Sequence, residues 1–287
     1  MLVMIFKIVL FILCLLVIYF LSRMKFKESF ENSQDDKWKV IYNDESEYQT
    51  INILEKDDKF ALVLNNEIQV HSDEYKISHY IQCSIPVKKY KPKSILILGG
   101  GDLLAASFCL KYDFVEKVKL VEIDEKVVDM VKKNLLFKEI TNKVYEDPRL
   151  VIEIQDALSF IRDDKETYDM IIEDIEIDFT KQETNMKISD FITYCMNKSP
   201  IYVGSIPDHK IKKNSSILKI SEMKKKEYFN IENKHKVLKE LNFNTEDLEK
   251  LKSILKKYDI SVAAYDYISE YGKEAYLMIH KKQIKKK

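Results

Sequence analysis

The sequence is short of glycine, of paired cysteines and of net charge. Its 287 residues include five glycines and four cysteines, Cys14, Cys83, Cys109 and Cys195. The cysteines are scattered, and no two of them have the spacing of a zinc site or of a redox CxxC motif. This spacing predicts a reducing compartment and no structural metal.

Charge of one sign is not in excess, because 47 lysines and arginines stand against 47 aspartates and glutamates. A chain with no net charge has no overall field that would attract nucleic acid, and we expect no nucleic-acid partner. Apolar side chains, by contrast, make up 46% of the residues. This content is sufficient for the core of a large domain together with a small one.

The longest hydrophobic run lies at the N-terminus. Residues 1–21 are apolar except for Lys7, and a helix of this length spans the hydrocarbon core of a bilayer. No small-residue cleavage site follows, which favours an uncleaved anchor over 1–22 and a polar tether over 23–37. Basic residues just after the run predict a single-pass membrane protein with the domain that follows in the cytosol. A packed core helix is the alternative.

Residues 38–85 are expected to form a small N-terminal β-domain. Three short runs, at 49–54, 60–64 and 67–71, alternate between apolar and polar residues as strands do. Clusters of Asp, Asn and Lys between them are turn signals. A helix is expected to follow these strands and to end before Pro86.

Residues 86–287 alternate between strand-like and helix-like segments. Buried strands are predicted at 94–100, 117–124, 149–157 and 168–177, with helices between them. A further helix, strand and helix follow, and the chain ends in two strand-like runs. Alternation at this spacing indicates a Rossmann-like α/β domain, in which a parallel sheet has helices on both faces.

Acidic residues stand at the carboxyl ends of four predicted strands, the edge where open α/β sheets bind ligands. They are Asp102, Glu122, Asp156 and Asp174. Glu122 follows a glycine turn by about twenty residues, the distance at which an acid accepts hydrogen bonds from ribose hydroxyls. Asp156 is placed to bind an adenine amino group. The alternative for Glu122 is a solvated acid at the N-terminus of the next helix.

Three of the five glycines are consecutive, Gly99 to Gly101, and Asp102 follows them. Bare backbone lets a ligand approach closely, but a dinucleotide motif would need a further glycine where Leu104 stands. A carboxylate would also repel a pyrophosphate bound at this turn. Asp102 therefore favours a ligand that is cationic here, such as a sulfonium nucleoside whose tail ends in an amine rather than a carboxylate.

Six motifs in register carry a resemblance to a known family. They are "SEYQTINI", "LVLNNEIQVHSDE", "GGGD", "LVEID", "QDA" and "ISEYGKEAYLMIHKK". In this order and spacing the chain resembles the spermidine synthase, or polyamine aminopropyltransferase, family.

The resemblance implies a small β-domain on a Rossmann-like domain of the type that binds S-adenosylmethionine (AdoMet), and usually a homodimer. It implies aminopropyl transfer from decarboxylated AdoMet, a co-substrate rather than a permanent cofactor, to a diamine or polyamine such as putrescine. Asp174 would be the proton acceptor, and Tyr271 would help to place the amine. By position, the donor would contact Gln49, Gly99, Gly101, Asp102, Glu122, Asp156 and Ala157.

The sequence also departs from the family pattern. Leu103 and Leu104 stand where the family turn usually continues with two glycines. Ile77 stands where the family usually has a substrate tyrosine, and Ile177 where its catalytic stretch usually has a second aspartate. Three functions stay open: an aminopropyltransferase-like enzyme, a nucleoside-binding relative without turnover, and an AdoMet-dependent methyltransferase.

Overall fold

The computed structural model describes residues 38–175, 186–206, 229–230, 245–266 and 273–281. The chain divides into two compact units, residues 1–72 and 73–287, each of which is described by itself. The sequence places this boundary at 85/86 instead. The difference arises because the short helices between 75 and 84 contact the helix that follows the glycine turn, and so belong to the larger unit.

The first unit, as far as the structure describes it, is an antiparallel sheet of four strands. In sequential order they are β1 (Lys39–Glu45), β2 (Thr50–Lys56), β3 (Lys59–Leu64) and β4 (Glu67–His71). Left-handed backbone at Asp57, Asn65 and Asn66 forms the tight turns around β3. The predicted small antiparallel sheet is confirmed. The sequence does not single out β1 as a strand, because β1 is mostly exposed and shows no clear hydrophobic alternation.

The second unit contains a mixed sheet of eight strands within the described residues. Its parallel strands are β5 (Ser94–Gly99), β6 (Lys117–Glu122), β7 (Leu150–Ile154), β8 (Met170–Asp174) and β9 (Ile201–Ile206). Its antiparallel strands are β10 (Phe229–Asn230), β11 (Tyr258–Asp266) and β12 (Lys273–Lys281). The order across the sheet is β10-β11-β12-β9-β8-β5-β6-β7. The predicted parallel sheet is thus confirmed, and the C-terminal strands extend it into a mixed one.

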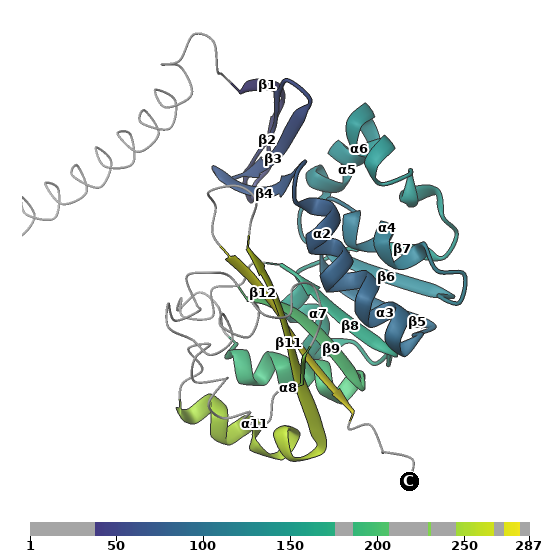
Figure 1. Cartoon of the computed structure of the whole chain (residues 1–287), viewed down its shortest axis with the longest axis vertical. Coiled ribbons are helices and arrows are strands. Elements are labelled where there is room, and N and C mark those ends of the chain that lie inside the picture. The colour runs from purple at the N-terminus through teal and green to yellow at the C-terminus, as the bar shows by residue number, and fades with distance from the viewer. Residues whose placement is uncertain (1–37, 176–185, 207–228, 231–244, 267–272, 282–287) are drawn as a thin grey trace, which may run out of the picture. The chain divides into compact units, whose positions relative to one another are not determined.

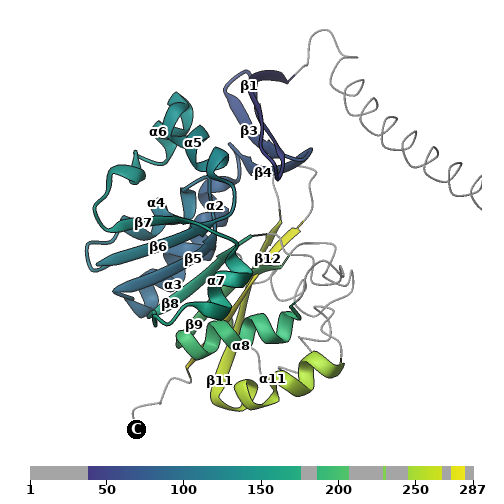
Figure 2. The same cartoon turned by 180° about the vertical axis from the view of Figure 1, so that it is seen from behind.

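Helical segments flank the second sheet. They are α2 (Tyr75–His79), η1 (Tyr80–Ser84), α3 (Ile85–Tyr90), α4 (Leu104–Leu110), α5 (Glu125–Lys133), α6 (Leu135–Ile140), η2 (Val144–Glu146), α7 (Ala157–Asp163), α8 (Ile188–Lys198) and α11 (Thr245–Lys257). Figure 1 shows α2 and α3 on one face, and Figure 2, the view from behind, shows α7, α8 and α11 on the other. The main core lies on the latter face, where Phe160, Phe191 and Leu251 pack with Leu98 of β5.

The segment after β4 differs from the prediction of one helix that ends before Pro86. Helix α2 is followed by η1, a π-helical turn, and then by α3, which continues to Tyr90. Pro86 is tolerated because it lies in the first turn of α3, where a backbone N–H has no acceptor within the helix. A π-helical turn holds one extra residue, so it changes the direction in which the neighbouring side chains point.

The expected membrane anchor, residues 1–22, and the tether, residues 23–37, lie outside the described residues. In the part of the chain that the structure describes, no helix is long and apolar enough to cross a membrane. The described residues therefore give no support to the membrane localisation predicted from the hydrophobic N-terminal run. Length and hydropathy are necessary for a membrane span, but by themselves they do not assign one.

Candidate active site

The turn between β5 and α4 lies directly against the end of β8. Gly99 and Gly100 have φ angles of 84° and 74°, in the region that favours glycine. A Cβ atom at Gly99 would lie 1.9 Å from Ile175 Cγ2 and 2.4 Å from the carbonyl oxygen of Asp174. The Gly100 N–H donates a hydrogen bond to the same oxygen at 3.0 Å. Glycine is required here because the turn and the β8 backbone approach so closely.

Glu122, at the end of β6, holds the other side of this turn. Its Oε2 accepts a hydrogen bond from Gly101 N at 3.0 Å, and its Oε1 accepts one from Asp124 N at 2.9 Å. A Cβ atom at Gly101 would lie 2.8 Å from Oε2, so a side chain at this position would displace the carboxylate. Burial raises the pKa of Glu122, and the backbone donors oppose that shift. Glu122 is therefore a buried acid at the ligand-binding edge of the sheet.

Leu103 keeps a backbone conformation that glycine adopts without strain. Its φ and ψ are 63° and 8°, and its side chain is fully buried at the start of α4. Asp102, just before it, accepts a hydrogen bond at Oδ1 from Leu104 N at 2.8 Å. The turn thus retains its left-handed form although leucine has replaced the usual glycine, and the first turn of α4 holds the Asp102 carboxylate.

Asp102, Asp174 and His79 come together from three segments. One side-chain oxygen or nitrogen of each lies within 4.8 Å of those of the other two. Burial, and then the charge of Asp174, raise the pKa of Asp102 to about 6, while His79 and the Leu104 N–H act in the opposite direction. This cluster at the carboxyl edge of β5 and β8 is suited to a cation and to proton transfer.

Asp174 and its neighbour Glu173 point to opposite faces of β8, as successive residues of a strand do. Tyr202 OH donates a hydrogen bond to Glu173 Oε2 in the interior, on the side where Tyr202 packs near Phe191 of α8. Asp174 instead accepts a hydrogen bond from Gln82 Nε2 at Oδ1, at 3.1 Å. Glu173 is therefore part of the packed interior, and Asp174 is the acid available at the edge.

Gln82 and His79 belong to the site but were not selected from the sequence. Gln82 Nε2 also donates to the carbonyl oxygen of Glu173 at 2.9 Å, so it ties η1 to the end of β8. Both residues lie where α2 passes into the π-helical turn η1. The orientation of their side chains depends on a turn type that a hydrophobic pattern does not indicate.

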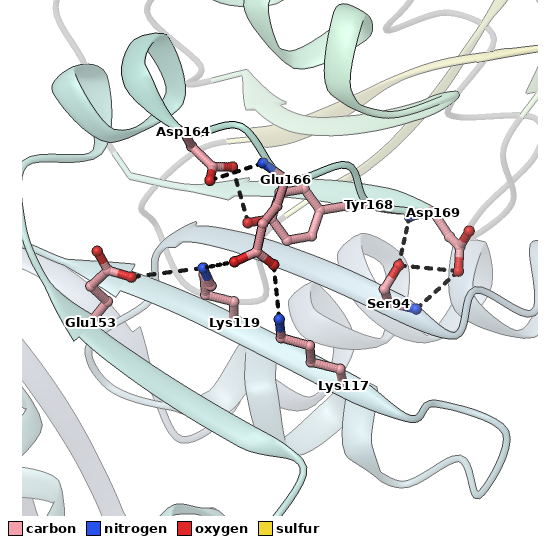
Figure 3. A network of polar contacts seen from close by, with 8 residues as sticks. All are labelled: Ser94, Lys117, Lys119, Glu153, Asp164, Glu166, Tyr168 and Asp169. Atoms are coloured by element: carbon pink, nitrogen blue, oxygen red, sulfur yellow. Dashed lines mark hydrogen bonds and ion pairs between the residues drawn. The ribbon is translucent and has the colours of Figure 1, made fainter.

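A second polar network lies at the amino-terminal ends of the parallel strands and is separate from this site (Figure 3). Glu166 accepts hydrogen bonds from Lys117 Nζ at 2.8 Å and from Lys119 Nζ at 2.6 Å. Asp169, just before β8, accepts hydrogen bonds from the backbone of Lys93 and Ser94. These contacts join the starts of β5, β6 and β8, and they support the sheet rather than a ligand.

The spermine/spermidine synthase domain matches residues 70–245, which is more than half of the chain and includes the whole cluster of Asp102, Asp174 and His79. The chain belongs to the spermine/spermidine synthase family. The resemblance that the motifs indicate is thereby confirmed.

Curated relatives match parts of the chain, and a solved structure shares its fold. The polyamine aminopropyltransferase of Oceanobacillus iheyensis is 33% identical over 137 residues, 47% of this chain and 27% of that protein. That of Buchnera aphidicola is 30% identical over 193 residues, 65% of this chain and 66% of that protein. In both cases the chain spans less than two thirds of the relative. A structure of a spermidine synthase in complex with the transition state analogue AdoDATO shares the fold, with a TM-score of 0.61, 22% identity, and coverage of 85% and 74%.

Two further family positions lie at the end of β7. Asp156 is the N-cap of α7 and accepts hydrogen bonds from Ser159 N at 2.8 Å and Leu158 N at 3.4 Å. Gln155 N, beside it, donates to the carbonyl oxygen of Glu122 at 2.9 Å, which keeps the ends of β6 and β7 together. Ala157 is buried in the first turn of α7. Asp156 thus has a structural role as a cap whether or not it binds a ligand.

The remaining family positions lie in the first unit, outside the described residues, or in an apolar cluster of the second unit. Gln49 belongs to the first unit, where its carbonyl oxygen accepts a hydrogen bond from Ser46 N at 2.9 Å. Tyr271 and Ile177 lie outside the described residues. Ile77 packs against the small apolar cluster around Ile81, so its side chain offers no hydrogen bond where the family usually has a tyrosine.

Proposed function

We propose that the protein transfers an aminopropyl group from decarboxylated AdoMet to a diamine or polyamine. The observation that carries this proposal is the carboxylate pair, Asp102 and Asp174, beside the glycine turn of the parallel sheet. Two carboxylates at such a turn favour a donor tail that ends in an amine and disfavour one that ends in a carboxylate. The relatives compared above are polyamine aminopropyltransferases, and the solved spermidine synthase holds a transition state analogue.

In the proposed reaction, the acceptor nitrogen forms a bond to the aminopropyl carbon that is attached to sulfur. The carbon–sulfur bond breaks, its electron pair stays on sulfur, and methylthioadenosine leaves as a neutral thioether. A free amine has a pKa of about 10, so the acceptor arrives as an ammonium ion and must lose a proton. Asp174 is the proposed acceptor of that proton. Alignment of nitrogen, carbon and sulfur supplies much of the remaining acceleration.

The other donor contacts are proposed by family position. The Glu122 carboxylate accepts backbone N–H groups, among them those of Gly101 and Asp124, and its remaining lone-pair capacity can bind ribose hydroxyls. Asp156 is proposed at the adenine, and Tyr271 at the acceptor amine. Backbone or side-chain contacts to the donor are further proposed for Gln49, Gly99, Gly101 and Ala157.

The test incubates the full chain with labelled decarboxylated AdoMet and a panel of amines, including putrescine. We expect an aminopropylated amine and methylthioadenosine in equal amounts. Asp174→Asn keeps the side-chain oxygen that accepts from Gln82 but removes the base, so we expect kcat to fall at least about 100-fold. If a correctly folded protein transfers nothing to any amine, the proposal is wrong.

Ile77 favours a second candidate, a relative that binds the nucleoside without turnover, because it removes a polar group from the expected acceptor side. Such a protein would be stabilised by decarboxylated AdoMet and by methylthioadenosine but would form no product. An AdoMet-dependent methyltransferase would instead bind AdoMet more tightly than its decarboxylated form, which would contradict the role given to Asp102.

We also propose that the protein is a homodimer, as is usual in the family. Light scattering coupled to size-exclusion chromatography should give twice the 34.0 kDa of one chain. The mass of one chain at micromolar concentration would contradict this proposal.

A further inference from the structure

The helices that cover one side of the second sheet expose lysine but no acid. Figure 1 shows α2 and α3 in one line, with α4 beside α2. Between residues 75 and 111, the exposed residues are six lysines and one tyrosine. They are Lys76, Tyr80, Lys88, Lys89, Lys91, Lys93 and Lys111. The acid in this range, Asp102, is half-buried at the active site. These seven exposed residues are called the lysine face below.

Five of the six lysines have no acidic partner within the described part of the chain. Lys93 forms an ion pair with Glu116, with 2.6 Å between Nζ and Oε1. No such contact is made by Lys76, Lys88, Lys89, Lys91 or Lys111 among the residues that the structure describes. Three of these lysines lie over aromatic rings instead, Lys76 over Tyr75, Lys89 over Tyr90 and Lys111 over Phe108. A ring attracts an ammonium group but does not neutralise its charge.

The positive charge of this face is destabilised in the free protein. Burial lowers the pKa of Lys89. Burial also lowers the pKa of Lys111, and the charge of Lys76 adds to this shift while Cys83 opposes it. An anion bound at the face would stabilise these ammonium groups, because it would replace part of the water that they have lost. The face is therefore suited to a ligand that carries several negative charges.

Tyr80 adds an aromatic surface among these charges. Its side chain is 42% exposed and follows Lys76 by about one helical turn, so the two side chains lie on the same side of the segment. Lys88 follows about 12 Å further along. Proteins bind single-stranded nucleic acid with such a combination, in which basic groups contact phosphates and an exposed ring stacks on a base. Bases within a duplex are already stacked on both sides, so Tyr80 favours a single strand.

We propose that the lysine face binds single-stranded nucleic acid, with phosphates at the five lysines that lack an ion pair and a base on Tyr80. This inference does not depend on the proposed function. The charge balance of the whole chain predicts no nucleic-acid partner, but that balance is an average and does not describe a single face. RNA and DNA offer the same phosphates and bases, so both belong in the test.

The experiment titrates labelled single strands of about 12 nucleotides, one of RNA and one of DNA with matched sequence, with the full chain. Fluorescence anisotropy gives the affinity from about 50 mM to about 200 mM salt. Each phosphate that is neutralised on a single strand contributes about −0.7 to the slope of log K against log salt concentration. Five lysines therefore predict a slope of about −3.5, and an affinity about 100-fold lower at the higher salt concentration. A preference for RNA or for DNA would identify the better ligand, and either preference supports the proposal.

Variants separate the charges from the ring. Lys88→Gln/Lys89→Gln should make the slope shallower by about 1.4, and the corresponding double arginine variant should restore it. Tyr80→Ser should weaken binding about 5-fold or more without changing the slope, and Tyr80→Phe should bind as the unaltered protein does. Lys132→Gln/Lys133→Gln changes two exposed lysines of α5 and is the matched control, which should alter neither affinity nor slope.

Four results would overturn the proposal. The first is no measurable affinity for either nucleic acid at about 50 mM salt. The second is an unchanged slope in Lys88→Gln/Lys89→Gln, or an equal change in the α5 control, which would place binding elsewhere on the chain. The third is equal affinity for a duplex and a single strand with no effect of Tyr80→Ser, which would remove the stacked base. The fourth is binding of polyglutamate but of neither nucleic acid, lost in Lys88→Gln/Lys89→Gln, which would identify an acidic protein partner instead.

Discussion

The surroundings of Asp102 disfavour the charged form of its carboxylate. Burial and the neighbouring Asp174 both raise its pKa, to about 6, and the Leu104 N–H compensates only in part. A residue that destabilises the fold and faces a ligand-binding edge is typical of a functional site.

Asp102→Asn should therefore increase stability and abolish function. The amide oxygen can keep the hydrogen bond from Leu104 N, while the half-buried charge beside Asp174 is removed. We expect a melting temperature higher by a few degrees and at least about 100-fold weaker binding of decarboxylated AdoMet. Asp113→Asn, at an exposed position, should change neither measurement. A lower melting temperature for Asp102→Asn would show that the charge stabilises the fold.

Donor binding should weaken as the pH falls through about 6. The folded-state pKa of Asp102 is raised from 3.8 to about 6, so the native protein takes up this proton before the unfolded chain does. Protonation therefore stabilises the fold but removes the charge that attracts the amine tail. The titratable groups around Asp102 are Asp174, His79 and Cys83. Titration calorimetry between pH 5 and 8 checks this, and binding of methylthioadenosine should be much less pH-dependent.

At position 103, a glycine variant should be more stable than an alanine variant, the reverse of their usual order in a helix. Both Leu103→Ala and Leu103→Gly lose a fully buried side chain, at a cost of about 2–5 kcal/mol. Only glycine relieves the left-handed backbone, so Leu103→Gly should be more stable than Leu103→Ala by roughly 0.5–1 kcal/mol. At Leu104, inside α4, alanine should be the more stable variant. Urea unfolding measures the stabilities of the four variants. The same order of alanine and glycine at both positions would contradict the strain argument.

At the scale of elements, the parallel strands are joined at both ends by polar contacts. The network in Figure 3 depends on Glu166, which two lysines contact and whose pKa they lower to about 2. Because that pKa is lowered on folding, its contribution is present above about pH 4.5 and is lost as the pH falls toward 2.

Glu166→Gln should lower the free energy of unfolding by about 0.5–1 kcal/mol at pH 7, since its side chain is 46% exposed and solvent screens the pair. The loss should shrink in 1 M salt and vanish near pH 2. Denaturant unfolding at several pH values measures this. An equal loss at pH 2 and pH 7 would mean that packing, and not charge, explains the effect.

Helix boundaries show why some elements resist prediction. The hydrophobic pattern over 125–137 indicates one helix, but Asn134 ends α5 and then caps α6 by accepting a hydrogen bond from Phe137 N at 3.2 Å. The hydrophobic pattern likewise does not predict the π-helical turn before Pro86. Both are settled by local hydrogen bonds that compete with a continuous helix, and apolar periodicity does not report on that competition.

At the scale of the whole molecule, ligand binding should raise the stability of the folded protein. A ligand at about 100 times its Kd stabilises the native state by about 2.7 kcal/mol if it does not bind the unfolded chain. We expect decarboxylated AdoMet to raise the melting temperature more than AdoMet does at equal concentration, because AdoMet adds a carboxylate near Asp102. Calorimetric melting of the full chain tests this, and a larger shift with AdoMet would favour the methyltransferase alternative.

The sequence by itself determined the strand–helix alternation, the glycine turn and the acids at the strand ends. These follow from short-range rules, because parallel strands necessarily bring their carboxyl ends to one edge. The tertiary structure decided that His79 and Gln82 face Asp102 and Asp174, that Glu173 does not, and that Leu103 keeps the backbone of a glycine. Those outcomes depend on contacts of α2 and η1 with α4 and with the end of β8, which lie further along the sequence, and hydrophobic periodicity leaves no trace of these contacts.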